Sequence, residues 1–266
     1  MQKLTIVKIG GNVIDDPRLL HRFLVDWAAV TGPKLLVHGG GKIASAIGQR
    51  LGIEPKMVDG RRITDAETLE VVTMVYGGLV NKNIVAQLQA LGNNAIGLTG
   101  ADANIIKAEK RPVKTIDYGF VGDVKGPESI NVAALDAMLQ AGFTPIVAPL
   151  THDGKGSLLN TNADTVASVL AVAMAQKYKV QLLYCFEKKG VLEDAANDDS
   201  VVELLTPDKY KTMQEKGQVF AGMLPKLDNA FATLQSGVSI VKIGQSEDVL
   251  AMAEGKAAGT TIALEA

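Results

Sequence analysis

Cysteine and the signals for export are almost missing from this sequence. The 266 residues include one cysteine, Cys185, which excludes an internal disulfide and any multi-cysteine metal site. Because Cys185 lies in the apolar run 180–186, we expect a buried and unreactive thiol. Residues 1–3 lead into an apolar strand without a signal peptide, and no uninterrupted apolar segment is long enough to span a bilayer. We therefore expect a cytoplasmic protein with no membrane partner.

The sequence also lacks an excess of charge of either sign. The formal net charge is -2, which provides no general field for binding nucleic acid. Any anionic ligand must then be held by a few locally placed groups. The apolar fraction of 47% is ample for a large core, so disorder is excluded and one domain with two lobes is expected.

Strand-like and helix-like apolar patterns alternate along most of the chain. This alternation predicts an α/β fold with a mostly parallel open central sheet and helices on both faces. Asp59-Gly60 predicts a hairpin within 57–64, and short glycine-punctuated segments over 104–128 predict antiparallel hairpins on the same sheet. The expected strands are 4–9, 34–38, 94–98, 144–148, 180–186, 239–243 and 260–264, and the expected helices are 19–27, 43–51, 65–91, 132–141, 162–177 and 223–236.

Glycine clusters follow the first two predicted strands, Gly10-Gly11 after the first and 39–41 after the second. Ligands of open α/β sheets bind beyond the carboxyl ends of the strands, where glycine lets backbone N–H groups approach an anion. Neither cluster fits a dinucleotide fingerprint or a P-loop. Tight turns are the alternative for either cluster alone, but two clusters on neighbouring strands favour phosphate or oxyanion binding.

Two lysines occupy positions that are unfavourable without an anionic partner. Lys8 lies inside a strand that should be buried on both faces, where an unpaired ammonium is costly. Lys226 opens a helix, at the end where the helix dipole repels a cation. Ordinary solvation is the alternative for Lys226. Asp164 follows the N-cap residue Asn162, and a carboxylate is favoured in a first turn without any functional reason.

Three further polar residues are candidates for holding a ligand carboxylate. Arg61 and Arg62 lie beside the predicted hairpin, and guanidinium forks match carboxylates in geometry, although a solvated pair is the default. Asn160 precedes the cap of the helix at 162–177, and routine capping does not account for it.

Taken in order, these segments resemble the amino-acid kinase family, and within it the members that phosphorylate an N-acylated glutamate. No single motif is decisive, but the ordered set is specific and covers most of the chain. The motifs are Val7-Lys8-Ile9-Gly10-Gly11, His38-Gly39-Gly40-Gly41, Gly60-Arg61-Arg62-Ile63-Thr64, Asn81-Lys82, Asn160-Thr161-Asn162-Ala163-Asp164 and Gly222-Met223-Leu224-Pro225-Lys226.

The resemblance implies an ATP-dependent phosphorylation of the side-chain carboxylate of N-acetyl-L-glutamate, or of another N-acyl-L-glutamate such as N-succinyl, to the 5-phosphate in arginine biosynthesis. It implies Mg²⁺ held mainly by the ATP phosphates, with no metal ligand from the protein. An N-lobe, 1–178, would bind the acylglutamate and form a homodimer, and a C-lobe, 179–266, would bind ATP. Arginine-inhibited members carry an extra N-terminal helix, so a homodimer insensitive to arginine is expected.

The resemblance also implies residue roles around the nucleotide. Lys8 would stabilise the transferring phosphoryl group, and Lys226 would stabilise the leaving side of the nucleotide. Asp164 would orient both lysines by hydrogen bonding. Gly11 would offer its backbone N–H to the phosphoryl oxygens, and Gly10 would border the nucleotide with Lys8 and Lys226.

The resemblance implies that Gly40 and Gly41 belong to the substrate site and offer their backbone N–H groups to the phosphoryl oxygens, as Gly11 does. Arg62 would bind the α-carboxylate of the substrate, and Asn160 would hold the same end. His38 would be structural, packed at the end of its strand.

The sequence departs from the family at 184–191, which reads YCFEKKGV where members often have an aspartate and a small residue. Adenine contacts therefore cannot be carried over to this segment. Residues 100–104 are a candidate wall of the acyl pocket, which leaves acetyl and succinyl both open. Two classes of alternative stay open as well: a related kinase acting on free glutamate, aspartate, carbamate or a nucleoside monophosphate, and a non-catalytic nucleotide sensor.

Overall fold

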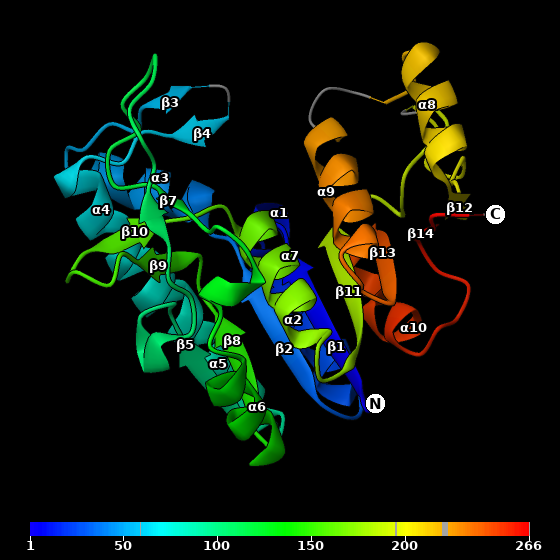
Figure 1. Cartoon of the computed structure of the whole chain (residues 1–266), viewed down its shortest axis with the longest axis horizontal. Coiled ribbons are helices and arrows are strands. Elements are labelled where there is room, and N and C mark those ends of the chain that lie inside the picture. Colours follow the sequence, from blue (N-terminus) through cyan, green and yellow to red (C-terminus); the bar gives the residue numbers. More distant parts are fainter. Residues whose placement is uncertain (59, 195, 220–222, 266) are drawn as a thin grey trace.

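The computed structural model describes residues 1–58, 60–194, 196–219 and 223–265. In these residues an eight-stranded sheet forms the centre of the molecule (Figure 1). Neighbouring strands are parallel except for one antiparallel pair, Ile240–Gln245 with Thr260–Ile262. In spatial order the strands are β12 (Leu204–Leu205), β14 (Thr260–Ile262), β13 (Ile240–Gln245), β11 (Lys179–Phe186), β1 (Lys3–Ile9), β2 (Lys34–His38), β8 (Thr144–Val147) and β5 (Ala95–Leu98).

Helices cover both faces of the sheet and bury a separate apolar core on each face. The predicted α/β class, with a mostly parallel sheet between two helical layers, is confirmed. The helices on one face are α6 (Val132–Gln140), α7 (Ala163–Met174), α8 (Pro207–Glu215) and α9 (Leu224–Gln235), and those on the other are α1 (Gly11–Asp15), α2 (Pro17–Ala29), α3 (Gly41–Arg50), α4 (Ala66–Val72), η1 (Thr73–Val80), α5 (Asn81–Ala90) and α10 (Val249–Ala253).

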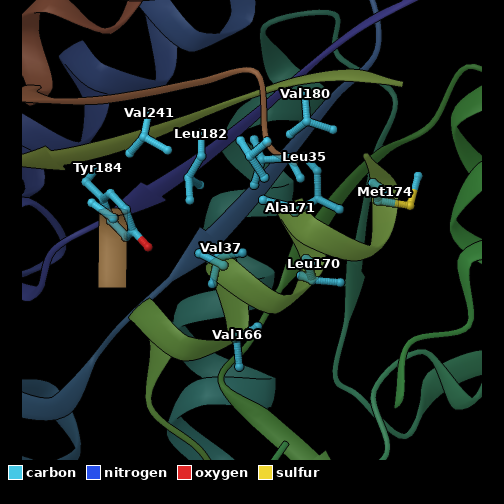
Figure 2. Packing of buried hydrophobic residues seen from close by; sticks show 14 of the residues in the cluster. Leu35, Val37, Val166, Leu170, Ala171, Met174, Val180, Leu182, Tyr184 and Val241 are labelled. Atoms are coloured by element: carbon cyan, nitrogen blue, oxygen red, sulfur yellow. The ribbon is translucent and has the colours of Figure 1, made fainter. Parts of the chain in front are cut away.

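Side chains alternate between the two cores along each central strand, as the pleat requires. In β1, Ile6 belongs to the core under α7, and Val7 belongs to the core under α2. The next residue, Lys8, therefore faces the α7 side and lies opposite Tyr184 in the strand register. Figure 2 shows this layer, in which residues of α7 pack against the sheet: Val166, Leu170, Ala171 and Met174 lie over Leu35, Val37 and Leu182.

The two strands that end in glycine clusters, β1 and β2, are neighbours in the sheet, as predicted.

A buried lysine fixes the connection between β1 and β2. Lys34, at the start of β2, donates hydrogen bonds to three carbonyl oxygens at the end of α2, those of Trp27, Ala28 and Val30, over 2.7–2.9 Å. The Trp27 carbonyl also accepts the backbone N–H of Val30. The Lys34 ammonium group thus caps the C-terminal end of α2 and joins it to the sheet.

Two predicted elements differ from the structure. The long helix expected over 65–91 is divided, because η1 between α4 and α5 is a π-helical segment. Gly77 lies in η1, where a Cβ atom would come within 3.4 Å of Thr99. The antiparallel hairpin within 104–128 exists as β6 (Glu109–Lys110) and β7 (Gly122–Asp123), but these strands form a separate small sheet and are not on the main one.

Other short elements were not predicted at all. They are β9 (Leu150–His152), its antiparallel partner β10 (Leu158–Asn160), β12, α8, α10 and the short turns η2 (Asp102–Asn104), η3 (Pro127–Ser129) and η4 (Ser246–Asp248). The predicted hairpin at 57–64 appears as β3 (Met57–Val58) and β4 (Arg61–Arg62), while its turn residue Asp59 lies outside the described residues.

The buried position predicted for Cys185 is confirmed, and burial raises the pKa of its thiol well above the usual range. Among the helices in the described ranges, none is long and apolar enough to cross a bilayer.

Candidate active site

Lys8 and Asp164 form a close ion pair at the carboxyl end of β1. The Lys8 side chain is 8% exposed, and its Nζ atom lies 2.7 Å from Oδ1 of Asp164. Asp164 stands in the first turn of α7, where Asn162 caps the helix by accepting hydrogen bonds from the backbone N–H groups of Asp164 and Thr165. The cap fixes the start of the helix, and the start of the helix places a carboxylate over the buried lysine.

Lys226 reaches the same place from α9. Its Nζ atom lies 3.7 Å from the centre of the Phe186 ring, and Nζ of Lys8 lies 5.2 Å from that centre. Burial lowers the pKa of the Lys226 ammonium, Asp164 opposes this effect, and the charge of Lys8 adds to it. Figure 1 shows α7 and α9 side by side, and the two helices are in contact. The motif residue Gly222, which precedes α9, lies outside the described residues.

The two glycine turns meet beside this group. A Cβ atom on Gly39 would lie 3.9 Å from the backbone nitrogen of Gly11. Gly11 and Gly41 are the first residues of α1 and α3, so their N–H groups have no partner within the helix. Gly40 has φ +143°, and a Cβ atom there would come within 3.2 Å of Tyr76. Only glycine fits that backbone conformation and contact.

Gly10 plays a different part from the other glycines. Its N–H group donates to the carbonyl oxygen of Cys185 over 3.0 Å, so it continues the pairing of β1 with β11 and is not a free donor for an anion. A Cβ atom on Gly10 would lie 3.4 Å from the Phe186 ring. The missing side chain thus lets the ring pack against the turn.

A buried histidine supports the second turn from below. His38 is completely buried, its Nδ1 atom lies 2.7 Å from the carbonyl oxygen of Gly39, and its Nε2 atom lies 3.1 Å from Nδ2 of Asn81. A carbonyl can only accept, so Nδ1 carries the proton, and Nε2 accepts from the amide. The Asn81 amide also donates to the carbonyl oxygen of Ile146 in β8. The neutral imidazole therefore ties the turn to α5 and to the sheet.

Of the predicted carboxylate-binding residues, Arg62 lies at the start of α3. Nη2 of Arg62 donates to the carbonyl oxygen of Gly41 and to the hydroxyl of Ser45, each over 2.8 Å. Nδ2 of Asn160 donates to the hydroxyl of Thr64 over 3.0 Å. Arg61, the other arginine of the motif, is exposed. The structure thus anchors Arg62 beside the glycine turn, with Asn160 tied to the same motif.

On the other side of the lysines is a cavity of about 260 Å³. Its walls come from the C-terminal part of the chain, and Phe186 and Lys226 both line it. Gly190 and Val191 also line it, so the segment in which the sequence departs from the family forms part of this cavity.

A buried polar cluster that the sequence did not reveal joins the elements that carry these groups. The Tyr184 hydroxyl lies 2.7 Å from that of Ser168, and Nδ2 of Asn229 donates to Ser168 over 2.6 Å and to Tyr184 over 3.2 Å. The Ser168 hydroxyl in turn donates to the carbonyl oxygen of Asp164. One signal was present in the sequence: Asn229 follows Lys226 by three residues, so both lie on one face of α9.

Ammonium groups and backbone N–H groups that gather at the carboxyl ends of parallel strands suit the transfer of a phosphoryl group. Comparison with known proteins leads to the same class: the chain belongs to the amino acid kinase family, whose model matches residues 3–244.

Curated relatives narrow the class to one kind of kinase. The chain is 56% identical over 261 residues to a Phocaeicola vulgatus protein named acetylglutamate kinase, with 98% of each chain covered. A Cytophaga hutchinsonii protein of the same name is 57% identical over 264 residues, which cover 98% of this chain and 99% of the relative. One from Methanopyrus kandleri is 39% identical over 251 residues, which cover 93% of this chain and 97% of the relative.

Solved structures share the fold. A Streptococcus mutans protein superposes with a TM-score of 0.76 at 27% identity, with 98% of this chain and 99% of the other covered. An N-acetylglutamate synthase from Neisseria gonorrhoeae superposes with a TM-score of 0.82 at 21% identity; all of this chain is covered, but it spans only 60% of the synthase. A Giardia lamblia carbamate kinase bound to AMP-PNP gives a TM-score of 0.69 at 14% identity over 99% of both chains.

The buried His38 predicts a loss of stability in mild acid. Burial lowers its pKa from 6.5 to about 4, so between these values the unfolded chain binds a proton that the folded chain does not. Stability therefore falls as the pH drops from 6.5 to 4, by on the order of 3 kcal/mol from this group. Urea denaturation of the wild type and of His38→Gln at pH 7 and pH 4 measures the difference.

The wild type and His38→Gln share the same carboxyl groups, so the contribution of these groups to the pH dependence of stability cancels in the comparison. His21→Gln, which removes an exposed histidine, controls for the loss of an imidazole. Parallel loss of stability in the wild type and in His38→Gln would show that His38 does not link folding to pH.

Proposed function

We infer that this protein is an acetylglutamate kinase, which transfers the terminal phosphoryl group of ATP to the side-chain carboxylate of N-acetyl-L-glutamate in arginine biosynthesis. The observation that carries this conclusion is the identity of more than half over nearly the full length to proteins of that name. The convergence of Lys8, Asp164, Lys226 and the glycine turns supports it independently.

The two substrates are proposed to approach the lysines from opposite lobes. The cavity beside Lys226 is lined by residues from the C-lobe, 179–266, and supports ATP binding there. Arg62, Asn160 and the second glycine turn belong to the N-lobe, 1–178, and support acylglutamate binding on that side. Lys8 belongs to the strand between the two halves of the sheet, where the γ-phosphate and the acceptor carboxylate would meet.

The chemistry needs positioning and neutralisation of charge more than covalent help. The acceptor carboxylate is already deprotonated, so no general base is required. Phosphoryl transfer passes through a loose transition state whose charge spreads over the phosphoryl oxygens. An ammonium group ~4 Å from such an oxygen contributes ~4 kcal/mol at an effective dielectric of ~20. Lys8 would act on the transferring group and Lys226 on the leaving side.

The remaining roles follow from the contacts. Asp164 holds the Lys8 ammonium and, by its charge, favours the protonated form of Lys226. The N–H groups of Gly11 and Gly41, together with Gly40, would meet the phosphoryl oxygens at the starts of two helices. Gly10 would border the nucleotide through its open Cα and not through its N–H group.

Mg²⁺ is proposed to enter with ATP, held mainly by the phosphates. The carboxylate of Asp164 already contacts the Lys8 ammonium, and Lys226 lies nearby. These residues suit an anion better than a dication, so they fit a metal carried by the nucleotide. The ion would neutralise charge between the β- and γ-phosphates.

A homodimer formed through the N-lobe, in the cytoplasm, completes the proposal. The half-exposed apolar side chains of Met74 and Leu79, both on η1, support an association surface in that lobe. Burial of such side chains between two copies of the chain would remove them from water.

ADP release in the presence of Mg²⁺ and ATP tests the function directly. The acceptors to compare are N-acetyl-L-glutamate, N-succinyl-L-glutamate, free glutamate and aspartate. We expect turnover with N-acetyl-L-glutamate and not with the free amino acids. Preference for the succinyl compound would change the acyl group within the same reaction, activity on a free amino acid would move the protein to a sibling kinase, and ATP binding without turnover would favour a sensor.

Lys8→Met should lower kcat by about 10²–10³, the scale for removing one preorganised donor to a developing oxyanion. Lys3→Met makes the same change at the exposed start of the same strand and should keep full activity. Circular dichroism and the urea midpoint establish that both variants fold. A kcat for Lys8→Met within threefold of the wild type would remove Lys8 from the reaction.

Arg62→Ala should chiefly raise KM for the acylglutamate, by about 10- to 100-fold, because it removes charge-assisted hydrogen bonds made in the ground state. Arg61→Ala is the matched control, since it deletes the exposed neighbouring guanidinium. KM for ATP should change little in both. If Arg61→Ala raises KM and Arg62→Ala does not, the wrong arginine has been assigned.

A further inference from the structure

Phe186 contacts more of the site than any role assigned above explains. It is the last residue of β11, and its ring is almost fully buried. The ring lies under the ammonium group of Lys226 at 3.7 Å and near that of Lys8 at 5.2 Å. It packs against the first glycine turn at Gly10 and stacks on Tyr184 with an angle of 3° between the rings.

Several charged groups act on the Lys226 ammonium beside the ring. Lys8 repels it, whereas Asp164, which contacts Lys8 directly, and Glu187 attract it. The face of an aromatic ring carries negative potential and attracts a cation, most strongly where water is excluded. Lys226 is partly desolvated, so the ring face offers its ammonium group a favourable contact that water no longer provides.

The ring also connects the lysines to the nucleotide side. Phe186 and Lys226 line the same cavity of about 260 Å³, in which ATP is proposed to bind. The position of the ring is fixed by its strand, by Tyr184 beneath it and by Gly10 at its edge. A rigid ring in this place can determine where a long, flexible lysine side chain holds its charge.

We propose that Phe186 is a positioning residue for phosphoryl transfer, whose ring face holds the Lys226 ammonium beside Lys8 at the edge of the nucleotide cavity. This inference rests on the proposed kinase function. Phe186 would orient Lys226, as the Asp164 carboxylate orients Lys8. Without the negative ring face, Lys226 samples other rotamers, and its ammonium group lies beside the leaving phosphate in a smaller fraction of molecules.

Fluorinated phenylalanines test this directly, because added fluorine weakens the negative face of the ring while nearly preserving its shape. The series places phenylalanine and its mono-, di- and trifluoro analogues at position 186 of the full chain. We expect kcat to fall stepwise with each fluorine, by on the order of tenfold in total. KM for N-acetyl-L-glutamate should stay constant, because Arg62 and Asn160 lie elsewhere.

Phe231 provides a matched control. It lies on α9 itself, is buried to nearly the same extent as Phe186, and stacks on Tyr210. Among the residues that the structure describes, no lysine lies over its ring. The same analogues at Phe231 should leave kcat unchanged. Equal rates across the series at Phe186, or equal losses at both positions, would overturn the proposal.

A second variant and a second measurement separate this inference from the proposed function. Phe186→Leu keeps apolar volume but removes the ring, so a purely packing role predicts activity near that of the wild type, while our proposal predicts a loss similar to that of the trifluoro analogue. Calorimetric ATP affinity is measured across the same series. If the wild type turns over no acylglutamate, the kinase proposal fails. In that case a stepwise loss of ATP affinity across the series would still support the role of Phe186 in positioning Lys226. Constant ATP affinity would then refute that role.

Discussion

A positive charge inside a buried parallel strand is the constraint on which the site depends. Removing an ammonium group from water costs several kcal/mol, so Lys8 requires a partner of opposite charge in a fixed position. Asp164 meets this requirement because it stands in the first turn of α7, where the helix dipole also favours a carboxylate. The position of α7 over β1 is therefore tied to the charge of Lys8, and the apolar face of the same helix packs the core behind it.

The position of Lys226 depends on polar contacts that its helix, α9, makes with α7 and β11. Asn229, one turn beyond Lys226 on α9, bonds to Ser168 of α7 and to Tyr184 of β11. Ser168 and Tyr184 are buried, and Asn229 is partly buried. A polar cluster with satisfied bonds orders its surroundings because breaking one bond leaves its partner unpaired. Bonds from α9 to α7 and to β11 thus help to set the spacing between the two lysines.

Sequence reasoning reached the parts of the site whose residues are unusual for their secondary structure. Lys8 in a strand and glycines after two strands contradict the local pattern, and such contradictions mark function. Phe186 and Tyr184 escaped notice because aromatic residues at the end of a buried strand are ordinary. Lys34 shows the opposite limit: it is as buried as Lys8, yet its ammonium group caps α2. The glycine cluster that directly follows the strand position of Lys8 separates the two lysines in the sequence. The π-helical segment was missed because its residues have the same apolar spacing as an α-helix.

The single central sheet accounts for how the two proposed substrate-binding halves would share one reaction centre. β1 lies between β11, which leads to the cavity proposed for the nucleotide, and β2, which ends in the second glycine turn. Parallel register sets Lys8 opposite Tyr184 on one side and opposite Val37 on the other. A register shift of one residue would turn the lysine to the α2 face, away from Asp164 and Phe186. In the proposed reaction, strand register would therefore set where Lys8 meets the transferring group, and the contact of Lys226 with the Phe186 ring would set the position of the second ammonium group.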